Sequence, residues 1–391
     1  MTPEARVASA ADILDDILGG APAERALTNW ARRSRFAGSR DRAAVRDIVF
    51  DALRRRRSYG WLGGDDTGRA LMLGRLRAAG EATGDVFTGA RHALDPLTED
   101  EVALSTDLVD APRAVRLDVA DWTLPHFDAA LGADADAVLA LLRDRAPVTL
   151  RANLARTTRE TLIRRLSADG FAAGPSTLAN AGVVVSGETR GLARHAAFDE
   201  GLFEFQDASP QAAMERIADL IAGADVLDFC AGGGGKALAA AALGAGRVVA
   251  HDANSRRMAD IPPRAKRAGV QIRIADTPRG LFDVVLVDAP CSGSGAWRRQ
   301  VDAKWRLTEA DLERLVATQR RIVADALVHV RHGGHLVYMT CSLFDVENAD
   351  QVRVFINAHQ RLKLENKRLF TPLEGGDGFF LAAMRVEEAA R

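Results

Sequence analysis

Through the first 145 residues, apolar positions recur at the spacing of amphipathic helices. Ile13, Leu14, Ile17 and Leu18 form one apolar stripe, and residues 44–53 form a second. Side chains three and four positions apart lie on the same face of a helix, so each stripe marks a face that packs inward. Similar stripes follow at 71–76 and 138–142. The pattern predicts an all-α domain over residues 1–145.

The pattern changes near residue 147. Short apolar runs at 148–150 and 181–185 are typical of strands, and Thr158 precedes a stretch with helical spacing that extends to residue 168. A threonine just before such a stretch is a good N-cap. We therefore expect a small α/β connector over residues 146–208.

From residue 209 onward, short apolar runs alternate with amphipathic stretches. The predicted strands cover residues 225–229, 247–250, 270–272, 283–287 and 335–339. The predicted helices cover residues 235–243, 254–268, 308–330 and 346–358. Alternation of this kind is typical of a parallel, doubly wound sheet. We predict a Rossmann-like α/β domain over residues 209–391.

Composition narrows the class of protein without naming a partner. The formal net charge is only −1, but ten arginines fall within residues 32–57, which suits either a nucleic-acid backbone or a solvated helix face. The chain has no long apolar run and no basic leader, so we expect neither a membrane span nor a secretory signal. Three cysteines, with no zinc-site spacing, favour the reducing cytoplasm and a protein without bound metal.

A glycine-rich turn follows the first predicted strand of the α/β domain. Its residues are Cys230, Ala231, Gly232, Gly233, Gly234, Gly235 and Lys236. Glycine lets the backbone approach a ligand closely, and the next helix presents free N–H groups at its start. Dehydrogenases have such a turn too, so it predicts a cofactor site without specifying the cofactor.

Acidic residues end the first four predicted strands of this domain, at Asp228, Asp252, Asp276 and Asp288. A carboxylate at the end of the second strand suits ribose hydroxyls. Acids on four neighbouring strands suit a ligand with a ribose, an adenine and a positive sulfonium better than a pyrophosphate. This ranks S-adenosylmethionine above NAD, although a single aspartate there is often only a helix cap.

Two of the three cysteines follow neighbouring predicted strands, Cys291 after the fourth and Cys341 after the fifth. One free cysteine is usually core packing, but two at one sheet edge favour chemistry. A thiolate that adds to carbon 6 of cytosine makes carbon 5 nucleophilic enough to accept a methyl group. Asp288 could hold the ring through its amine and nitrogen 3. The base must be unstacked, which favours single-stranded or loop RNA.

These motifs resemble the Sun/Fmu-type (RsmB/NOP-like) family of RNA cytosine-5 methyltransferases. The resemblance is carried by residues 228–231 and 234–236, Asp252 with Arg257, Asp276, residues 288–293 and residues 340–342, with Glu347 and Asn348 following. Residues 302–305 and Gln319 also fall where the family has similar residues. Residues 150–153 and 201–209 are similar to its RNA-binding lead-in, and the helical domain resembles the NusB-like domain of bacterial members.

The resemblance implies a class I methyltransferase fold that binds S-adenosylmethionine through residues 230–236, Asp252, Arg257, Asp276 and Asp288. It implies that Cys341 is the nucleophile, that Cys291 acts in product release, and that Asp288 and Lys236 belong to the catalytic residues. The expected partner is RNA, ribosomal RNA above all, and we expect a cytoplasmic monomer.

The sequence departs from the family pattern in the cofactor loop and leaves other functions open. Gly232 and Gly233 replace the usual Ala-Pro, and Ala237 replaces the usual threonine. Extra glycine loosens a loop, which predicts weaker cofactor binding. The alternatives are a transfer-RNA methyltransferase, a non-catalytic RNA-binding assembly factor, and a DNA methyltransferase, in which the Pro-Cys cysteine, here Cys291, would attack.

Overall fold

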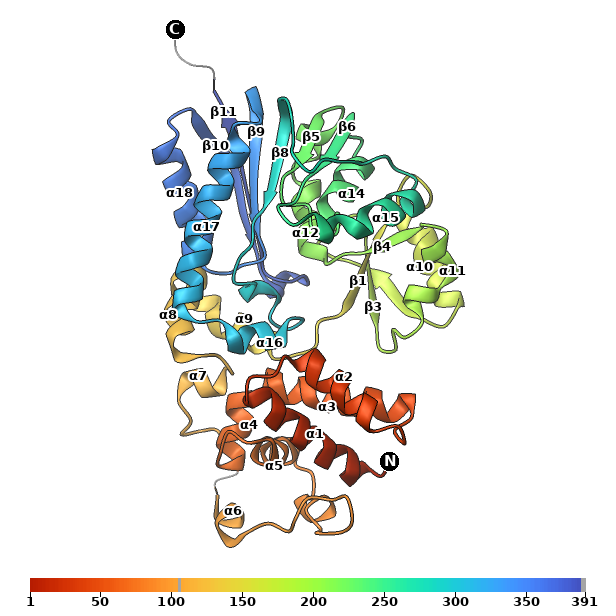
Figure 1. Cartoon of the computed structure of the whole chain (residues 1–391), viewed down its shortest axis with the longest axis vertical. Helices are drawn as coiled ribbons and strands as arrows, with labels where there is room; N and C mark the ends of the chain where they lie inside the picture. Colours follow the sequence, from red (N-terminus) through yellow and green to blue (C-terminus); the bar gives the residue numbers. More distant parts are fainter. Residues whose placement is uncertain (105–106, 388–391) are drawn as a thin grey trace. The chain divides into compact units, whose positions relative to one another are not determined.

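A computed structural model describes residues 1–104 and 107–387, which form two compact units (Figure 1). The helical unit contains residues 1–128, 133–145 and 297–306. The sheet unit contains residues 129–132, 146–296 and the chain from residue 307 onward. The short segment 297–306 therefore packs with the helical unit although the chain on both sides of it belongs to the sheet unit. No helix in the described ranges is long and apolar enough to cross a membrane.

The helical unit contains no strand in its described residues, as the apolar periodicity predicted. Its helices are α1 (Pro3–Leu18), α2 (Ala23–Arg33), α3 (Ser39–Arg54), α4 (Arg56–Gly63), α5 (Gly68–Ala79), α6 (Glu99–Ala103), α7 (Arg113–Arg116), α8 (Leu124–Leu131), α9 (Ala135–Leu142) and α16 (Val301–Arg306), with short 3₁₀ turns η1 (Thr83–Asp85), η2 (Asp121–Thr123) and η3 (Gly132–Asp134). The predicted stripes on α1 and α3 are buried in one core, which also contains Val301 of the inserted segment.

Close packing of α4 against α5 explains one glycine of this unit. A Cβ atom at Gly74 would lie 1.9 Å from the carbonyl oxygen of Tyr59, so only glycine allows the two helices to approach this closely. Gly64 follows the last residue of α4 as its C-cap, and its φ of 86° is left-handed.

The first part of the sheet unit is a small four-stranded sheet in the order β2-β3-β1-β4. Its strands are β1 (Val148–Ala152), β2 (Ala172–Pro175), β3 (Gly182–Ser186) and β4 (Phe203–Phe205), accompanied by α10 (Arg159–Ala168), η4 (Leu192–Arg194) and α11 (Ala196–Asp199). The predicted strands at 148–150 and 181–185 are confirmed. Thr158 caps α10 as predicted, because its side-chain oxygen accepts a hydrogen bond from the Thr161 amide at 3.1 Å.

The second part is a seven-stranded sheet in the order β10-β11-β9-β8-β5-β6-β7. Its strands are β5 (Asp225–Asp228), β6 (Arg247–Ala250), β7 (Arg273–Ile274), β8 (Phe282–Asp288), β9 (Val330–Thr340), β10 (Leu362–Phe370) and β11 (Phe379–Val386). Its helices are α12 (Ala208–Glu215), α13 (Ala218–Ile221), α14 (Gly235–Ala242), α15 (Ile261–Ala268), α17 (Glu309–Leu327) and α18 (Ala349–Ala358), with 3₁₀ turns η5 (Ser255–Asp260), η6 (Ser294–Ala296), η7 (Asp345–Glu347) and η8 (Pro372–Glu374).

Helices cover both faces of this sheet, as the prediction of a doubly wound fold requires. Val226 and Val248 point to the core shared with α12, α13 and α14, whereas the next residues, Leu227 and Val249, point to the core shared with α17 and α18. This alternation follows from the two-residue period of a strand. Figure 1 shows α17 and α18 on one side of the sheet and α12, α14 and α15 on the other.

The prediction of a purely parallel sheet is wrong at one edge. Strands β5 to β9 are parallel, but β11 pairs antiparallel with both β9 and β10. The sequence analysis missed both C-terminal strands. The edge strand β10 is mostly polar, and β11, with the sequence FFLAAMRV, is apolar except for Arg385 because both of its faces are buried. Neither strand keeps the alternation of a half-buried strand over its full length.

Other predicted boundaries also shift for local reasons. The strand predicted at 270–272 is displaced to residues 273–274, because the Val270 amide donates to the Ala265 carbonyl at the end of α15. The helix predicted over 254–268 is a 3₁₀ turn until residue 260, after which two prolines begin α15. The helix predicted over 308–330 ends at Leu327, since β9 begins at Val330, and the first residues of the 346–358 helix form a 3₁₀ turn.

Candidate functional site

The carboxyl ends of β5, β6, β8 and β9 lie along one edge of the seven-stranded sheet, because these strands are parallel. β5 lies between β6 on one side and β8 on the other, so the strand order reverses there. Ligands of open α/β sheets bind at such a reversal. The glycine loop, the strand-end acids and the two cysteine loops all follow these strands.

The glycine loop connects β5 to α14 through a tight turn. The Gly234 amide donates to the Ala231 carbonyl at 2.8 Å, and Gly232 and Gly234 have left-handed φ values of 48° and 82°. A Cβ atom at Gly234 would lie 2.8 Å from the Ile261 side chain. Glycine at 232 therefore suits the conformation that this loop adopts, although other family members are expected to carry a different residue pair there.

Asp252 joins this loop to the next one. Its carboxylate, only 5% exposed, accepts hydrogen bonds from the Gly232 amide and the Asn254 amide, each at 2.9 Å. Arg257 lies 3.2 Å from the same carboxylate. Asp276 is exposed after β7, and its carboxylate forms no hydrogen bond or ion pair with the described part of the chain. Of the two predicted ribose and adenine acids, only Asp252 is therefore held in place by the protein.

Asp228 is the most deeply buried of the strand-end acids, at 1% exposure. Within residues 1–104 and 107–387, neither carboxylate oxygen has a hydrogen-bond partner of good geometry, although the Ala237 amide is close enough to lower the pKa of Asp228 slightly. Burial, together with the nearby charge of Asp288, raises the pKa of Asp228 to about 7. Buried acids without donors are uncommon in folded proteins. Such a group beside a glycine loop suits a ligand that brings hydrogen-bond donors or positive charge.

Lys236 and Asp288 form an ion pair across the edge of the sheet. The Lys236 ammonium, at the start of α14, donates to the Asp288 carboxylate at the end of β8. Burial opposes the charged form of Lys236, but Asp288 outweighs it and holds the pKa of the lysine above its usual value. Cys341 adds to this effect, so the ammonium lies within electrostatic reach of that sulfur. A nearby cation favours a thiolate over a thiol.

The two cysteines predicted to meet at the sheet edge are in contact. The Sγ atoms of Cys291 and Cys341 lie 3.4 Å apart, and both residues are partly exposed. The hydrogen bond to Cys341, together with burial, raises the pKa of the Cys291 thiol well above its usual value. Cys291 is therefore held as a protonated thiol next to the sulfur of Cys341.

Cys230, the third cysteine, has a different environment. Its side chain packs against the core on the α17 side of the sheet, whereas Cys341 packs against the core on the opposite side. Burial raises the pKa of Cys230 far above its usual value, so its thiol stays protonated. Only its backbone belongs to the glycine loop.

A buried polar network lies beneath the two cysteine loops. The Glu347 carboxylate, with no exposed surface, accepts hydrogen bonds from the Ser292 amide at 2.8 Å and the Ser342 hydroxyl at 2.6 Å. The Gln319 amide donates to the same carboxylate at 3.0 Å. In addition, the Gly295 amide donates to the Cys341 carbonyl at 3.0 Å. The sequence analysis noted Glu347 and Gln319 only by resemblance, and nothing in their spacing revealed that they meet.

Residues of the small sheet support the glycine loop from the other side. Arg151, on β1, donates to the Gly235 carbonyl at 3.3 Å and also bonds Gln206, and the Arg264 guanidinium donates to the Gly233 carbonyl. Asn153 donates to the carbonyls of Gly201 and Ala268, each at 2.9 Å. Arg151, Asn153 and Gln206 belong to the segments expected to contact RNA, whereas Arg264 belongs to α15, and the protein uses the polar groups of all four internally. No pattern in the sequence predicted this role.

Half of the arginine cluster at residues 32–57 is neutralised by nearby acids. Arg33, Arg46, Arg55, Arg56 and Arg57 each form an ion pair. The structure therefore shows that part of the predicted basic patch is a salt-bridged helix surface, which contributes little net positive charge.

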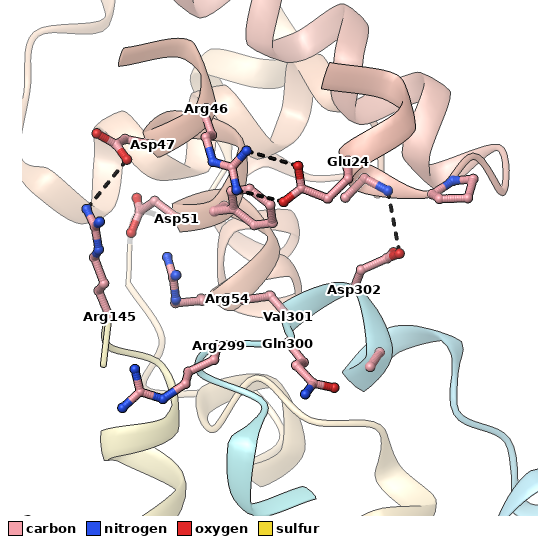
Figure 2. Close-up of a pocket in the computed structure, with 14 residues that line it drawn as sticks. Glu24, Arg46, Asp47, Asp51, Arg54, Arg145, Arg299, Gln300, Val301 and Asp302 are labelled. Atoms are coloured by element: carbon pink, nitrogen blue, oxygen red, sulfur yellow. Dashed lines mark hydrogen bonds and ion pairs between the residues drawn. The ribbon is translucent and has the colours of Figure 1, made fainter. Parts of the chain in front are cut away.

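Figure 2 shows a cavity of about 740 Å³ that this cluster lines together with the inserted segment. Arg46 forms a bidentate pair with Glu24, and Arg145 lies 3.6 Å from Asp47. Arg54 projects into the cavity near Asp51 and donates through Nε to the Arg298 carbonyl at 3.2 Å. Arg299 comes from the inserted segment.

Comparison with known proteins agrees with this geometry. Residues 218–385 match the model of the 16S rRNA methyltransferase RsmB/F family. Residues 119–190 match the ferredoxin-like domain that accompanies RsmF/B-like methyltransferases. The chain is 29% identical over 290 residues to ribosomal RNA small subunit methyltransferase B of Serratia proteamaculans, and the match covers 67% of this chain and 65% of that protein. The chain thus spans about two-thirds of the length of this RsmB relative.

Solved structures show the same fold. The crystal structure of PH0851 matches 99% of both chains with a TM-score of 0.76 and 20% identity. A methyltransferase homolog from Pyrococcus horikoshii matches 72% of this chain and 99% of its own, with a TM-score of 0.61 and 24% identity. The sheet unit thus has the Rossmann-like methyltransferase fold that was predicted.

The RsmB/F family is S-adenosylmethionine-dependent, and the residues at the sheet edge fit this cofactor. The residues that would hold it are those of the glycine loop, Asp228 and Asp252. The loop offers backbone without side chains, and the two carboxylates suit the hydroxyl and amino groups and the positive charge of the cofactor. Within the described chain, no group of three or more His, Cys, Asp or Glu side chains is placed to hold a metal ion.

Proposed function

We propose that this protein methylates carbon 5 of a cytosine in RNA, with Cys341 as the nucleophile and small-subunit ribosomal RNA as the favoured substrate. The contact between Cys291 and Cys341, 3.4 Å apart and beside the Lys236–Asp288 pair, carries the proposal. The RNA substrate rests on the relatives, which are ribosomal RNA small subunit methyltransferases. S-adenosylmethionine, when bound, supplies a methyl group on a positively charged sulfur.

In the first step, the Cys341 thiolate donates an electron pair to carbon 6 of cytosine and forms a C–S bond. The ring electrons shift to carbon 5 and toward nitrogen 3, so carbon 5 becomes nucleophilic. Nitrogen 3 takes up a proton as the electrons shift, and Asp288, at the end of β8 one strand from Cys341, then accepts hydrogen bonds from the amine and the protonated nitrogen 3 of the base. Lys236 stabilises the thiolate before the attack.

Once carbon 5 carries the methyl group, a base removes its proton. The released electron pair re-forms the double bond between carbons 5 and 6, and the C–S bond breaks with its electron pair on the Cys341 sulfur, which takes the Cys291 proton and leaves as a thiol. Cys291 acts in this release step. Because its pKa is raised while Cys341 is close, Cys291 is the thiol of the pair that can give its proton to the leaving sulfur.

The test is transfer of a labelled methyl group from S-adenosylmethionine to total RNA, with bisulfite sequencing to identify 5-methylcytosine. We expect Cys341→Ser to lose at least about 1,000-fold in transfer rate, since an alcohol is a far weaker nucleophile than a thiolate. Binding of S-adenosylhomocysteine should be unchanged. Full turnover by Cys341→Ser would overturn the assignment. If Cys341→Ser stays active and Cys291→Ser loses methyl transfer, the result favours the DNA-type mechanism, in which Cys291 attacks.

A further inference from the structure

Three of the five tryptophans of the chain line one pocket of the helical unit. Trp61 comes from α4, Trp122 from η2 and Trp305 from α16, and the pocket has a volume of about 650 Å³. Trp61 is 39% exposed, and the other two rings are half-buried. Large aromatic side chains usually bury their faces, so three that share an open pocket indicate a binding surface.

The inserted segment fixes one of the three rings. The Trp305 indole nitrogen donates to the Leu53 carbonyl at 2.6 Å, and Lys304 lies 4.5 Å from the ring centroid. On α4, Arg57 and Trp61 are four residues apart, so both side chains project from the same face of the helix. The helix therefore positions Trp61, and the indole hydrogen bond positions Trp305, without a ligand.

The charges around the pocket do not make it a phosphate site. Arg56 pairs with Asp66, and Arg57 lies 2.8 Å from Asp121, so both guanidiniums already have a carboxylate partner. The third acid of the lining, Asp65, forms no ion pair within residues 1–104 and 107–387, and one of its oxygens accepts from the Asp66 amide at 2.7 Å. Arg56 lies 5.5 Å from the centroid of the Trp305 ring, so that ring already has cationic neighbours. The pocket therefore offers the rings of Trp61 and Trp122 and an uncompensated carboxylate, which suit a flat ligand that donates hydrogen bonds.

We propose that this tryptophan pocket binds an unpaired guanine of the RNA substrate. Unpaired bases stack on aromatic side chains in most sequence-specific RNA complexes. Guanine alone presents two adjacent donors, N1–H and the N2 amino group, on its Watson–Crick edge, and a carboxylate accepts both. The edges of adenine, cytosine and uracil place an acceptor beside their donors, and a carboxylate repels it. The choice of RNA as ligand rests on the proposed function.

The experiment measures binding of the full chain to the pentaribonucleotides UUGUU and UUAUU, without cofactor, by fluorescence anisotropy of labelled RNA. We expect UUGUU to bind about 10-fold more tightly. Trp61→Ala should lose about 10-fold for UUGUU, in keeping with the usual effect of removing one stacking ring, and Trp61→Phe should restore most of that loss. Asp65→Asn should abolish the preference for guanine, because it weakens binding of UUGUU and removes the repulsion that weakens binding of UUAUU.

The control is Val328→Ala, which removes an apolar side chain that is 68% exposed, outside the pocket. It should bind both RNAs like the wild type, and equal melting temperatures show that each variant folds. Equal affinity of Trp61→Ala and wild type for UUGUU overturns the proposal, as does a guanine preference that survives Asp65→Asn. If Trp61→Ala instead loses only binding of an arginine-rich peptide, the pocket recognises a cationic protein segment and the proposal is wrong.

Failure here and failure of the proposed chemistry are distinguishable. The pentamers contain no step that requires Cys341, so Cys341→Ser should keep the guanine preference. A guanine preference without methyl transfer contradicts the proposed enzyme, whereas methyl transfer without the preference contradicts only the pocket assignment.

Discussion

The hydroxyl of Ser342 donates a 2.6 Å hydrogen bond to the buried carboxylate of Glu347. The same carboxylate binds Ser292, which follows Cys291 in the chain. One acid thereby holds the residues next to both cysteines, and this explains how two loops from different strands keep their sulfur atoms in contact.

Glu347→Gln should separate the two cysteine loops. An amide offers one acceptor oxygen where the carboxylate offers two, and its NH₂ group would face the donors of Ser292 or Ser342. Hydrogen bonds to buried charged groups are worth about 1.5–3 kcal/mol each, so we expect the free energy of unfolding to fall by roughly 2–4 kcal/mol. Methyl transfer should fall much further than the affinity for S-adenosylhomocysteine. Glu365→Gln is the control, since Glu365 is 39% exposed and pairs only at the surface.

Cys291→Ser should trap a covalent complex with RNA. If Cys291 acts in release, its loss leaves the C–S bond between Cys341 and carbon 6 of the base intact after methyl transfer. A denaturing gel of the variant with RNA and S-adenosylmethionine should then show a shifted protein band. The double variant that also carries Cys341→Ser should show none. Absence of the band in the single variant would remove Cys291 from the release step.

Asp252→Asn should weaken cofactor binding. Asp252 accepts from the amides of Gly232 and Asn254, and an asparagine NH₂ group at one of these positions would face a donor. We expect the Kd of S-adenosylhomocysteine, measured by calorimetry, to rise about 10-fold or more, in line with the loss of charge-assisted hydrogen bonds. Asp225→Asn, at the opposite end of the neighbouring strand, should keep the wild-type affinity. Unchanged affinity in the Asp252 variant would exclude it from the cofactor site.

Stability should rise with pH above neutrality because of Lys304. The side chain is 4% exposed, and burial lowers the pKa of Lys304 to about 7. An unfolded lysine has a pKa of about 10.4, so between these values the unfolded chain binds more protons and stability increases with pH. This gain is absent below about pH 7, where both states are protonated.

Urea unfolding at about pH 7 and about pH 9 measures this effect. From about pH 7 to about pH 9, the unfolding free energy of the wild type should rise relative to that of Lys304→Met by roughly 2–3 kcal/mol. The exposed Lys363→Met, whose side chain is 68% exposed, should leave the pH dependence as in the wild type. If the unfolding free energies of Lys304→Met and the wild type change with pH in the same way, the pKa of Lys304 is not lowered in the folded protein.

The sequence by itself determined the elements that carry the chemistry. Apolar periodicity placed the helical unit, the strands that end at Asp228, Asp288 and Thr340, and the cap at Thr158, because these features depend on local spacing. Parallel strands align their carboxyl ends, so the meeting of Cys291 and Cys341 at one edge could also be predicted.

Only the tertiary structure decided the rest, since it depends on contacts between residues that are distant in sequence. The antiparallel hairpin of β10 and β11 follows from pairing with β9, and no local pattern encodes that pairing. The inserted segment 297–306 packs with the helical unit because Val301 fills its core and Lys304 bonds the end of α3. The tryptophan pocket, like the Glu347 network, unites residues that the sequence keeps far apart.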